Sequence, residues 1–347
     1  MRWDNLSAPP DEGTPGGAAP ATPPLPLALP GAVARTFDTP GFAGMTFYEV
    51  QAKSIINRVP GVSRVPFEWT INPYRGCSHA CKYCFARNSH TYLDLDAGAD
   101  FDRKVIVKVN AGVLVRRELA APRWRGAHIA MGTNVDCYQR AEGRYRLMPP
   151  IIEALRDFAN PFSILTKGTL LLRDLPLLRQ AAEVARVGLS YSIGFVDEAL
   201  WRAVEPGTPS PRRRLDAVRQ LTDAGFQVGV LMAPILPGLS DDDESIEATV
   251  AAIAAAGATS VTPLALHLRP GAREWYAHWL ARDFPHLVPR YQQLYRSGAY
   301  APQAYQRELT ARVRIAARRH GLHRGERGDN RSLPEPPPAP AEQLTLL

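Results

Sequence analysis

Three of the chain's four cysteines lie close together. They fall in the stretch NPYRGCSHACKYCFAR (72–87) with the spacing C-x3-C-x2-C, and they are Cys77, Cys81 and Cys84. Thiolates are soft ligands that suit zinc or an iron–sulfur cluster. Gly76 before the first cysteine, with the small Ser78 and Ala80 between cysteines, would allow the loop to curl around one metal centre. The stretch therefore predicts a metal site with three thiolate ligands.

The fourth position of this site has two interpretations. For zinc, the remaining ligand would be His79, His90 or Cys137, although structural zinc sites usually combine two ligand pairs and the chain has no second pair. For a four-iron cluster, three thiolates would leave one iron with open coordination, which is typical of a reactive metal centre.

Several features of the chain favour a reducing, cytoplasmic location. Four cysteines, three of them clustered, do not resemble a disulfide framework. The N-terminus MRWDNLSAPPDEG has acids and prolines where a signal peptide needs an apolar run. The alanine-rich run 249–258 is too short to span a membrane.

The net charge of +7 permits contact with nucleic acid without requiring it.

Short apolar, β-branched runs alternate with longer helical patterns through the middle of the chain. This alternation predicts βαβ units and a parallel α/β sheet, either doubly wound or barrel-like. The predicted strands are 67–72, 127–133, 162–168, 187–195, 226–235 and 260–268. The predicted helices are 108–121, 149–159, 171–185, 211–224 and 243–256, followed by a helical stretch at 272–320.

Polar and reactive residues follow these strands, as expected for a site at the carboxyl edge of a parallel sheet. The three clustered cysteines follow the first predicted strand. Thr133, Asn134, Asp136 and Cys137 follow the second, and Lys167 ends the third. We therefore expect these side chains to meet at one end of the sheet.

The pattern C-x3-C-x-aromatic-C after the first strand resembles the radical S-adenosylmethionine (SAM) superfamily. The phrases GTNVDCYQRAE (132–142), LTKGTLLLRD (165–174) and EPGTPSPRRRLDAVRQLTDAG (205–225) are similar to the branch related to spore photoproduct lyase. An actinobacterial group of radical SAM proteins is more similar still. The resemblance implies a partial (β/α)6 barrel of the radical SAM type that binds a 4Fe–4S cluster and SAM. It also implies reductive cleavage of SAM to a 5′-deoxyadenosyl radical, which then abstracts a hydrogen atom.

The same resemblance implies roles for individual residues. The three clustered cysteines match the cluster ligands, and Tyr83 matches the aromatic residue whose backbone contacts the adenine of SAM. Lys167 matches a lysine that neutralises the SAM carboxylate, because a cation beside a carboxylate makes a charge-assisted contact. Ser192 matches a ribose-contacting serine. A surface lysine and an ordinary strand hydroxyl are the alternative interpretations of these last two.

Further cofactor contacts are implied with open alternatives. Thr133, Asn134 and Asp136 occupy the region that binds the SAM amino group or methionyl part, and the Asp136 carboxylate would suit an ammonium. Arg214 could hold a carboxylate or simply begin a helix. Cys137 lies in the region where spore photoproduct lyase has a hydrogen-atom donor, although a lone buried cysteine is usually a small apolar residue.

The implied function is that of a radical SAM enzyme with lyase-like activity on DNA or another nucleic acid. The arginine-rich segment 307–331, with eight arginines against three acids, could track phosphates. A cellular electron donor such as flavodoxin or ferredoxin would be required. One alternative is a radical SAM enzyme that modifies a peptide, an RNA base or a small metabolite. Another is a zinc-binding module without catalysis.

Composition also predicts the domain organisation. Residues 1–40 are rich in proline, alanine and glycine, which is typical of a disordered leader, and residues 325–347 form a similar proline-rich tail. Between them we expect a lead-in segment at 41–64, the radical SAM core at 65–270 and a helical extension at 271–324.

Overall fold

The protein is described by a computed structural model, in which residue 29 and residues 31–60 and 65–322 are placed. Its main feature is a seven-stranded sheet with the order β11-β10-β9-β8-β7-β4-β3. Each pair of neighbours from β4 to β11 is parallel, and β3 pairs antiparallel with β4 at the edge. These strands are β3 (Ile56–Arg58), β4 (Trp69–Ile71), β7 (Ile129–Met131), β8 (Phe162–Thr166), β9 (Val187–Ser192), β10 (Val228–Ile235) and β11 (Ser260–Ala265).

The strand order decides between the two predicted sheet types. All six predicted strands are present, and their spatial order follows their order in the chain. A doubly wound sheet would instead reverse direction at a switch point. Parallel strands that advance in one direction with right-handed crossovers curve into a barrel wall. The chain therefore has the predicted α/β fold of partial-barrel type.

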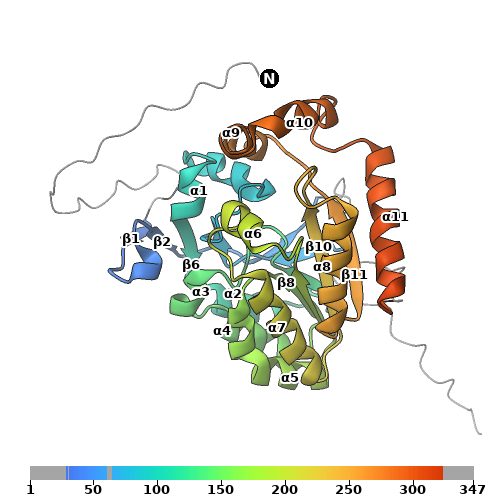
Figure 1. Ribbon diagram of the computed structural model, residues 1–347. Helices are drawn as coiled ribbons and strands as arrows, with labels where there is room; N and C mark the ends of the chain where they lie inside the picture. Colours follow the sequence, from blue (N-terminus) through green and yellow to red (C-terminus); the bar gives the residue numbers. More distant parts are fainter. Residues whose placement is uncertain (1–28, 30, 61–64, 323–347) are drawn as a thin grey trace, which may run out of the picture.

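Helices cover the outside of this sheet (Figure 1). The five predicted helices correspond to α2 (Ala111–Leu119), α4 (Met148–Asp157), α5 (Leu175–Val184), α7 (Pro211–Asp223) and α8 (Asp243–Ala255). The side chains of Ser210 and Asp242 cap α7 and α8, as expected for a serine and an aspartate directly before a helix. Strands β8 and β10 are buried along their whole length, because helices cover one face and the barrel interior the other.

Several short elements were not predicted from the sequence. They are the α-helices α1 (Ala99–Arg103), α3 (Arg140–Tyr145) and α6 (Glu198–Val204), and the 3₁₀ helices η2 (Pro40–Phe42) and η3 (Phe85–Leu93), while η4 (Thr169–Asp174) overlaps the start of the predicted helix 171–185. The helices η2, α1, α3 and α6 have 3 to 7 residues, too few to show a hydrophobic period, whereas η3 has 9 residues, as many as the predicted α2.

A second, four-stranded sheet was also missed. Its order is β1-β2-β6-β5, and its strands are β1 (Val33–Arg35), β2 (Thr46–Val50), β5 (Tyr74–Arg75) and β6 (Lys104–Lys108). The prediction of a disordered leader up to residue 40 is therefore wrong for its last part, because β1 pairs with β2. Residues 1–28 and 30 and the predicted tail lie outside the described residues.

The C-terminal part of the described chain is helical. It contains α9 (Ala272–Asp283), η5 (Pro285–Leu287), α10 (Val288–Leu294) and α11 (Gln303–Arg319). Helices α9 and α10 lie together at one end of the molecule, and α11 runs beside α8 (Figure 1). No helix among the described residues combines the length and the apolar character needed to cross a membrane.

Gly132, directly after β7, is a position where the fold requires glycine. Its φ of +75° lies in the left-handed region, and a Cβ there would overlap the carbonyl oxygen of Leu165 in the neighbouring strand. Gly126 has a similar φ of +70°, but a Cβ at that position would meet no atom within 4 Å. Any other residue would therefore strain the backbone at both positions, but of the two only Gly132 also lacks room for a Cβ atom.

We predict that Gly132→Ala lowers the free energy of unfolding by about 3 kcal/mol or more, because overlap adds to backbone strain. Gly126→Ala, the control, should cost about 1 kcal/mol from strain alone. Urea denaturation of both variants checks this. Equal losses of unfolding free energy in the two variants would contradict the prediction, because they would show that the backbone at Leu165 moves aside at little cost.

Candidate functional site

The loop that carries the three cysteines leaves the carboxyl end of β4 and is held from one side by the residues that follow β7. The side chain of Gln139 spans the loop: the Ser78 amide donates to its Oε1 (2.8 Å), and its Nε2 donates to the Gly76 carbonyl (2.9 Å). Gly76 has a φ of +82°, and Ala80 a φ of +52°. These values confirm that the loop curls at the small residues.

The connection between β9 and α7 holds the loop from the other side. The amide of Lys82 donates to the carbonyl of Val204 (2.9 Å), and the amide of Gly207 donates to the carbonyl of His79 (3.1 Å). The segment 205–210 therefore packs directly against the turns between the cysteines. These backbone bonds compensate for the absence of regular secondary structure in the loop.

Arg87 fixes the end of the loop. Its guanidinium is fully buried, donates to the carbonyl of Cys81 (2.9 Å) and pairs with both oxygens of Asp102 (2.8 and 3.0 Å). The guanidinium carbon lies 5.2 Å from the ring centroid of Phe101 and 4.8 Å from that of Trp275. This side chain links the loop to α1 and α9, and no sequence pattern had indicated it.

The three thiols form a donor set that fits an iron–sulfur cluster. All are free, Cys77 and Cys81 are buried, and Cys84 is half-buried. Burial raises the pKa of each thiol, and the Cys77 pKa is raised further by Asp136 and by the other two thiols. The three thiols thus lie on one loop and influence one another's ionisation, and as buried thiolates they would require a compensating positive charge, which a bound metal cluster would supply.

A site for one zinc ion has less support. Among the described residues, no three His, Cys, Asp or Glu side chains are placed as ligands of a single metal ion. His90 Nε2 lies 2.8 Å from the Lys104 carbonyl, and His79 Nδ1 lies 3.3 Å from Asp136. Cys137 is fully buried in the main core. Of the three candidates for a fourth zinc ligand, His79 and His90 therefore contact other groups, and Cys137 is enclosed by the core.

Lys167, directly after β8, and Ser192, at the end of the neighbouring β9, face one another. The Lys167 ammonium donates to Ser192 Oγ (2.6 Å), which donates in turn to the carbonyl of Ala233 (2.9 Å). Lys167 also lies 5.7 Å from the ring centroid of Tyr83, in the cysteine loop. The structure thus brings together three of the residues that the sequence assigned to SAM.

Glu205 joins this group, although no sequence pattern singled it out. Its side chain is fully buried and accepts hydrogen bonds from the Tyr83 hydroxyl and from Arg214 (2.5 Å), while Lys167 Nζ lies 3.8 Å away. Burial alone would raise the pKa of Glu205, but Arg214 and Lys167 hold it below its usual value. Its place at the start of EPGTPSP, directly before a Pro-Gly turn, was the available sign in the sequence.

Arg214 lies behind the site. Its guanidinium is fully buried and donates to the Ser192 carbonyl (2.8 Å) as well as to Glu205. Its hydrogen bonds therefore go to buried groups of the protein. A direct contact between Arg214 and SAM stays a prediction, and these bonds do not support it.

Asp136 is held by protein donors on both carboxylate oxygens. Oδ1 accepts from the Tyr138 amide (2.9 Å) and the Thr166 hydroxyl (2.6 Å), and Oδ2 accepts from the Lys167 amide (2.7 Å). Burial would raise the pKa of Asp136, but the His79 ring and these hydrogen bonds outweigh it and hold the pKa at about 2. The carboxylate thus fixes the turns after β7 and β8. Its contact with the amino group of SAM stays a prediction.

The remaining predicted residues have simpler surroundings. Thr133 is half-buried with its hydroxyl 3.0 Å from that of Thr70, and Asn134 is half-buried beside it. Cys137 has no exposed surface and belongs to the main core. This burial favours the interpretation of Cys137 as a small apolar residue, and its role as hydrogen-atom donor stays a prediction.

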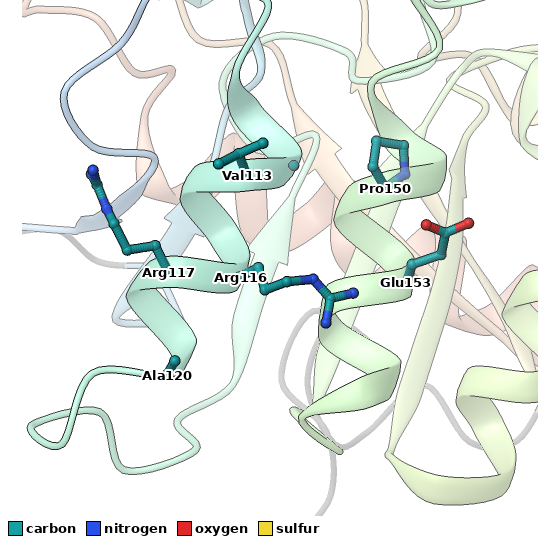
Figure 2. Close-up of a pocket in the computed structure, with 7 residues that line it drawn as sticks. Val113, Arg116, Arg117, Ala120, Pro150 and Glu153 are labelled. Atoms are coloured by element: carbon teal, nitrogen blue, oxygen red, sulfur yellow. The ribbon is translucent and has the colours of Figure 1, made fainter.

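A groove elsewhere on the surface contains none of these residues. It lies between α2 and α4, and Figure 2 shows Arg116 extending from α2 toward α4 while Arg117 points away. Arg116 pairs with the exposed Asp157 (2.6 Å). The groove is a junction between two outer helices and has no site chemistry.

Comparison with known proteins places this geometry in context. The family model of the radical SAM superfamily matches residues 71–250. The uncharacterized protein Rv2578c of Mycobacterium tuberculosis is 49% identical over 311 residues, which are 88% of this chain and 90% of that protein. The uncharacterized protein MJ0683 of Methanocaldococcus jannaschii is 31% identical over 195 residues, 56% of this chain and 69% of that protein.

Solved structures of spore photoproduct lyase have a similar fold. One variant with bound AdoMet and dinucleoside spore photoproduct superimposes with a TM-score of 0.59 at 16% identity, over 78% of each chain. Another variant gives a TM-score of 0.58 over 79% of each chain. At this identity the likeness concerns the fold alone.

We predict that Asp136 makes stability depend on pH. Its pKa is lower in the folded chain (about 2) than its ordinary value of 3.8, so its contribution is complete above about pH 4 and is lost as the pH falls toward 2. The difference in unfolding free energy between the natural chain and Asp136→Asn should therefore shrink by about 2 kcal/mol over that range. Denaturant titrations at several pH values measure it.

The exposed Asp216, which pairs with Arg219 at 2.9 Å, provides the control. Because solvent screens this pair, Asp216→Asn should change the unfolding free energy by less than about 0.5 kcal/mol at any pH. A pH-independent difference for Asp136→Asn would contradict the role given to its hydrogen bonds.

Proposed function

The chain belongs to the radical SAM superfamily, and we propose that its cysteine loop binds a 4Fe–4S cluster together with SAM. The observation that carries the proposal is the set of three free thiols on one loop, next to Lys167 and Ser192 at the ends of neighbouring strands. When bound, the cluster would supply the electron that cleaves the sulfonium bond of SAM.

The chain's own residues would bind and orient SAM. The Lys167 ammonium is positioned to meet the SAM carboxylate, because Glu205 is shared between Lys167 and Arg214 and cannot neutralise both cations. The Ser192 hydroxyl, which accepts a hydrogen bond from Lys167, would contact the ribose of the same ligand. Tyr83 would present its backbone to the adenine, with its ring fixed by the hydrogen bond to Glu205.

We propose that the substrate is a nucleic acid and that the reaction is lyase-like. A spore photoproduct lyase of similar fold carries a dinucleoside photoproduct. The arginine-rich helix α11 gives weaker support than the sequence suggested, because Arg312 and Arg319 pair with Asp243 and Glu247 of α8. Residues 323–331 of that segment lie outside the described residues.

A group of partly exposed rings supports the same substrate class. Phe85 follows the last clustered cysteine; its ring centroid lies 5.6 Å from that of His267, which lies 5.5 Å from that of Tyr300 in a stacked geometry. Arg269 lies over the Phe85 ring and donates to the Tyr300 hydroxyl (3.2 Å). Burial and Arg269 lower the pKa of His267 to about 4, so its ring is neutral at pH 7. Neutral rings beside a cation suit a base and its phosphate.

The remaining proposals follow from the chemistry. A reduced flavodoxin or ferredoxin would serve as electron donor, and the cytoplasm would keep the thiols reduced. The competing proposal is a radical SAM enzyme that acts on a peptide, an RNA base or a small metabolite. A zinc module without catalysis would bind one zinc and no iron.

We predict that Cys81→Ala abolishes both the cluster and SAM cleavage. Anaerobically prepared natural chain should be brown, contain about four iron and four sulfide per chain, and release 5′-deoxyadenosine from SAM when reduced. Cys137→Ala is the matched control. It should keep its iron, because Cys137 is buried in the main core and is not one of the proposed cluster ligands. A colourless protein with one zinc per chain would contradict the proposal.

We predict that Tyr300→Ala weakens binding of single-stranded DNA by about tenfold, because stacking on an aromatic ring contributes about 1–3 kcal/mol per base. Fluorescence anisotropy at two salt concentrations measures this and should also show weaker binding at higher salt. Tyr92→Ala is the control, since Tyr92 is 76% exposed and outside the ring group. Absent or salt-independent binding would exclude the nucleic-acid substrate and leave the radical chemistry in place.

A further inference from the structure

We propose that Glu205 is a positioning residue that fixes the turn between Cys81 and Cys84 and holds Lys167 in place for SAM. This inference rests on the proposed function and goes beyond it, because Glu205 would act without touching either cofactor. It makes one testable assignment: the buried charge of Glu205 is required for cofactor geometry, not only for folding.

The contacts of Glu205 converge on the site from three separate segments. Its Oε1 accepts from the hydroxyl of Tyr83, which lies between the last two cysteines. Its Oε2 accepts from Arg214 of α7 at 2.5 Å, and Lys167, after β8, lies 3.8 Å from Oε1. The residue before Glu205, Val204, accepts the amide hydrogen of Lys82 in the same loop. One carboxylate thus ties the cysteine loop to two other parts of the barrel.

The charges around Glu205 explain why a carboxylate is needed there. Arg214 and Lys167 are two cations, and both pair with the single negative charge of Glu205. With Glu205 present, these three side chains carry one surplus positive charge, located on the Lys167 side that faces Ser192. An anionic ligand such as the SAM carboxylate can balance that surplus. Without Glu205, two unbalanced cations would repel each other and displace Lys167.

The chain contains a second buried glutamate that also bonds a tyrosine and an arginine, although its arginine, Arg173, is partly exposed and pairs with Asp174 as well. Glu142 is fully buried and accepts from the Tyr74 hydroxyl (2.6 Å) and from Arg173 (2.7 Å). It also accepts from the amides of Leu147 and Met148 at the start of α4. Both glutamates are therefore buried, and each accepts from one tyrosine and one arginine. Of the two, Glu205 is the one that contacts the cysteine loop and Lys167.

This pair allows a matched experiment with Glu205→Gln and Glu142→Gln. Both variants should lower the melting temperature, because each removes a buried carboxylate that pairs with an arginine, although Arg173 keeps its pair with Asp174. Only Glu205→Gln should weaken SAM binding to the reconstituted, reduced protein, by about tenfold or more, since small displacements of positioning groups have effects of this size. Its iron content should stay near that of the natural chain. Glu205→Asp, which keeps the charge, should recover part of the affinity.

A second measurement needs neither iron nor SAM. Trypsin cleaves after Lys82, inside the turn that Glu205 is proposed to fix, so cleavage at Lys82 of the metal-free full chain should be about tenfold faster in Glu205→Gln than in Glu142→Gln. Equal SAM affinity and equal cleavage in the two Gln variants would overturn the assignment. If the natural chain binds neither iron nor SAM, the proposed function fails, and the trypsin rates still decide whether Glu205 positions the loop. If Glu205→Gln does not fold, Glu205→Asp is compared with Glu142→Asp instead: the shorter carboxylate should still weaken SAM binding and speed cleavage at Lys82 at position 205 only, and equal values in the two Asp variants would overturn the assignment.

Discussion

The cysteine loop depends on buried hydrogen bonds from the rest of the protein, because it has almost no regular secondary structure of its own. Gln139 spans it on the side of β7, Val204 and Gly207 bond it on the side of α7, and Arg87 bonds the Cys81 carbonyl. These bonds hold the loop in the curled form that a cluster with three thiolate ligands would need. The barrel provides this by bringing the ends of distant strands together.

Buried charge is the second constraint on the site. Asp136 and Glu205 are both ionised despite burial, because each has several donors at hydrogen-bond distance. Asp136 joins the turns after β7 and β8, and Glu205 joins the cysteine loop to α7. Both carboxylates therefore hold backbone and cations in position around the thiols. Lys167 lies between the two, its amide bonded to Asp136 and its ammonium near Glu205.

Sequence reasoning identified most elements with strong patterns and missed those without them. The six barrel strands and five of their helices have periodic apolar runs, and the cysteine spacing identified the site. In the second sheet β1 and β5 have only 3 and 2 residues, but β2 and β6 have 5 each and were missed as well, although KVIVK of β6 is rich in valine and isoleucine. Glu205 and Arg87 could not be selected either, because an acidic or basic residue in a loop usually lies in solvent. Their importance comes from burial, which depends on tertiary contacts.

In the proposed site, Cys77, Cys81 and Cys84 would hold a cluster and leave one iron open to SAM. Electron–nuclear double resonance on the reduced protein tests it directly, with SAM isotopically labelled at its carboxylate oxygen and at its amino nitrogen. We expect hyperfine coupling of both labels to the cluster, since both groups would bind the open iron. A reduced cluster signal without coupling to either label would contradict the account.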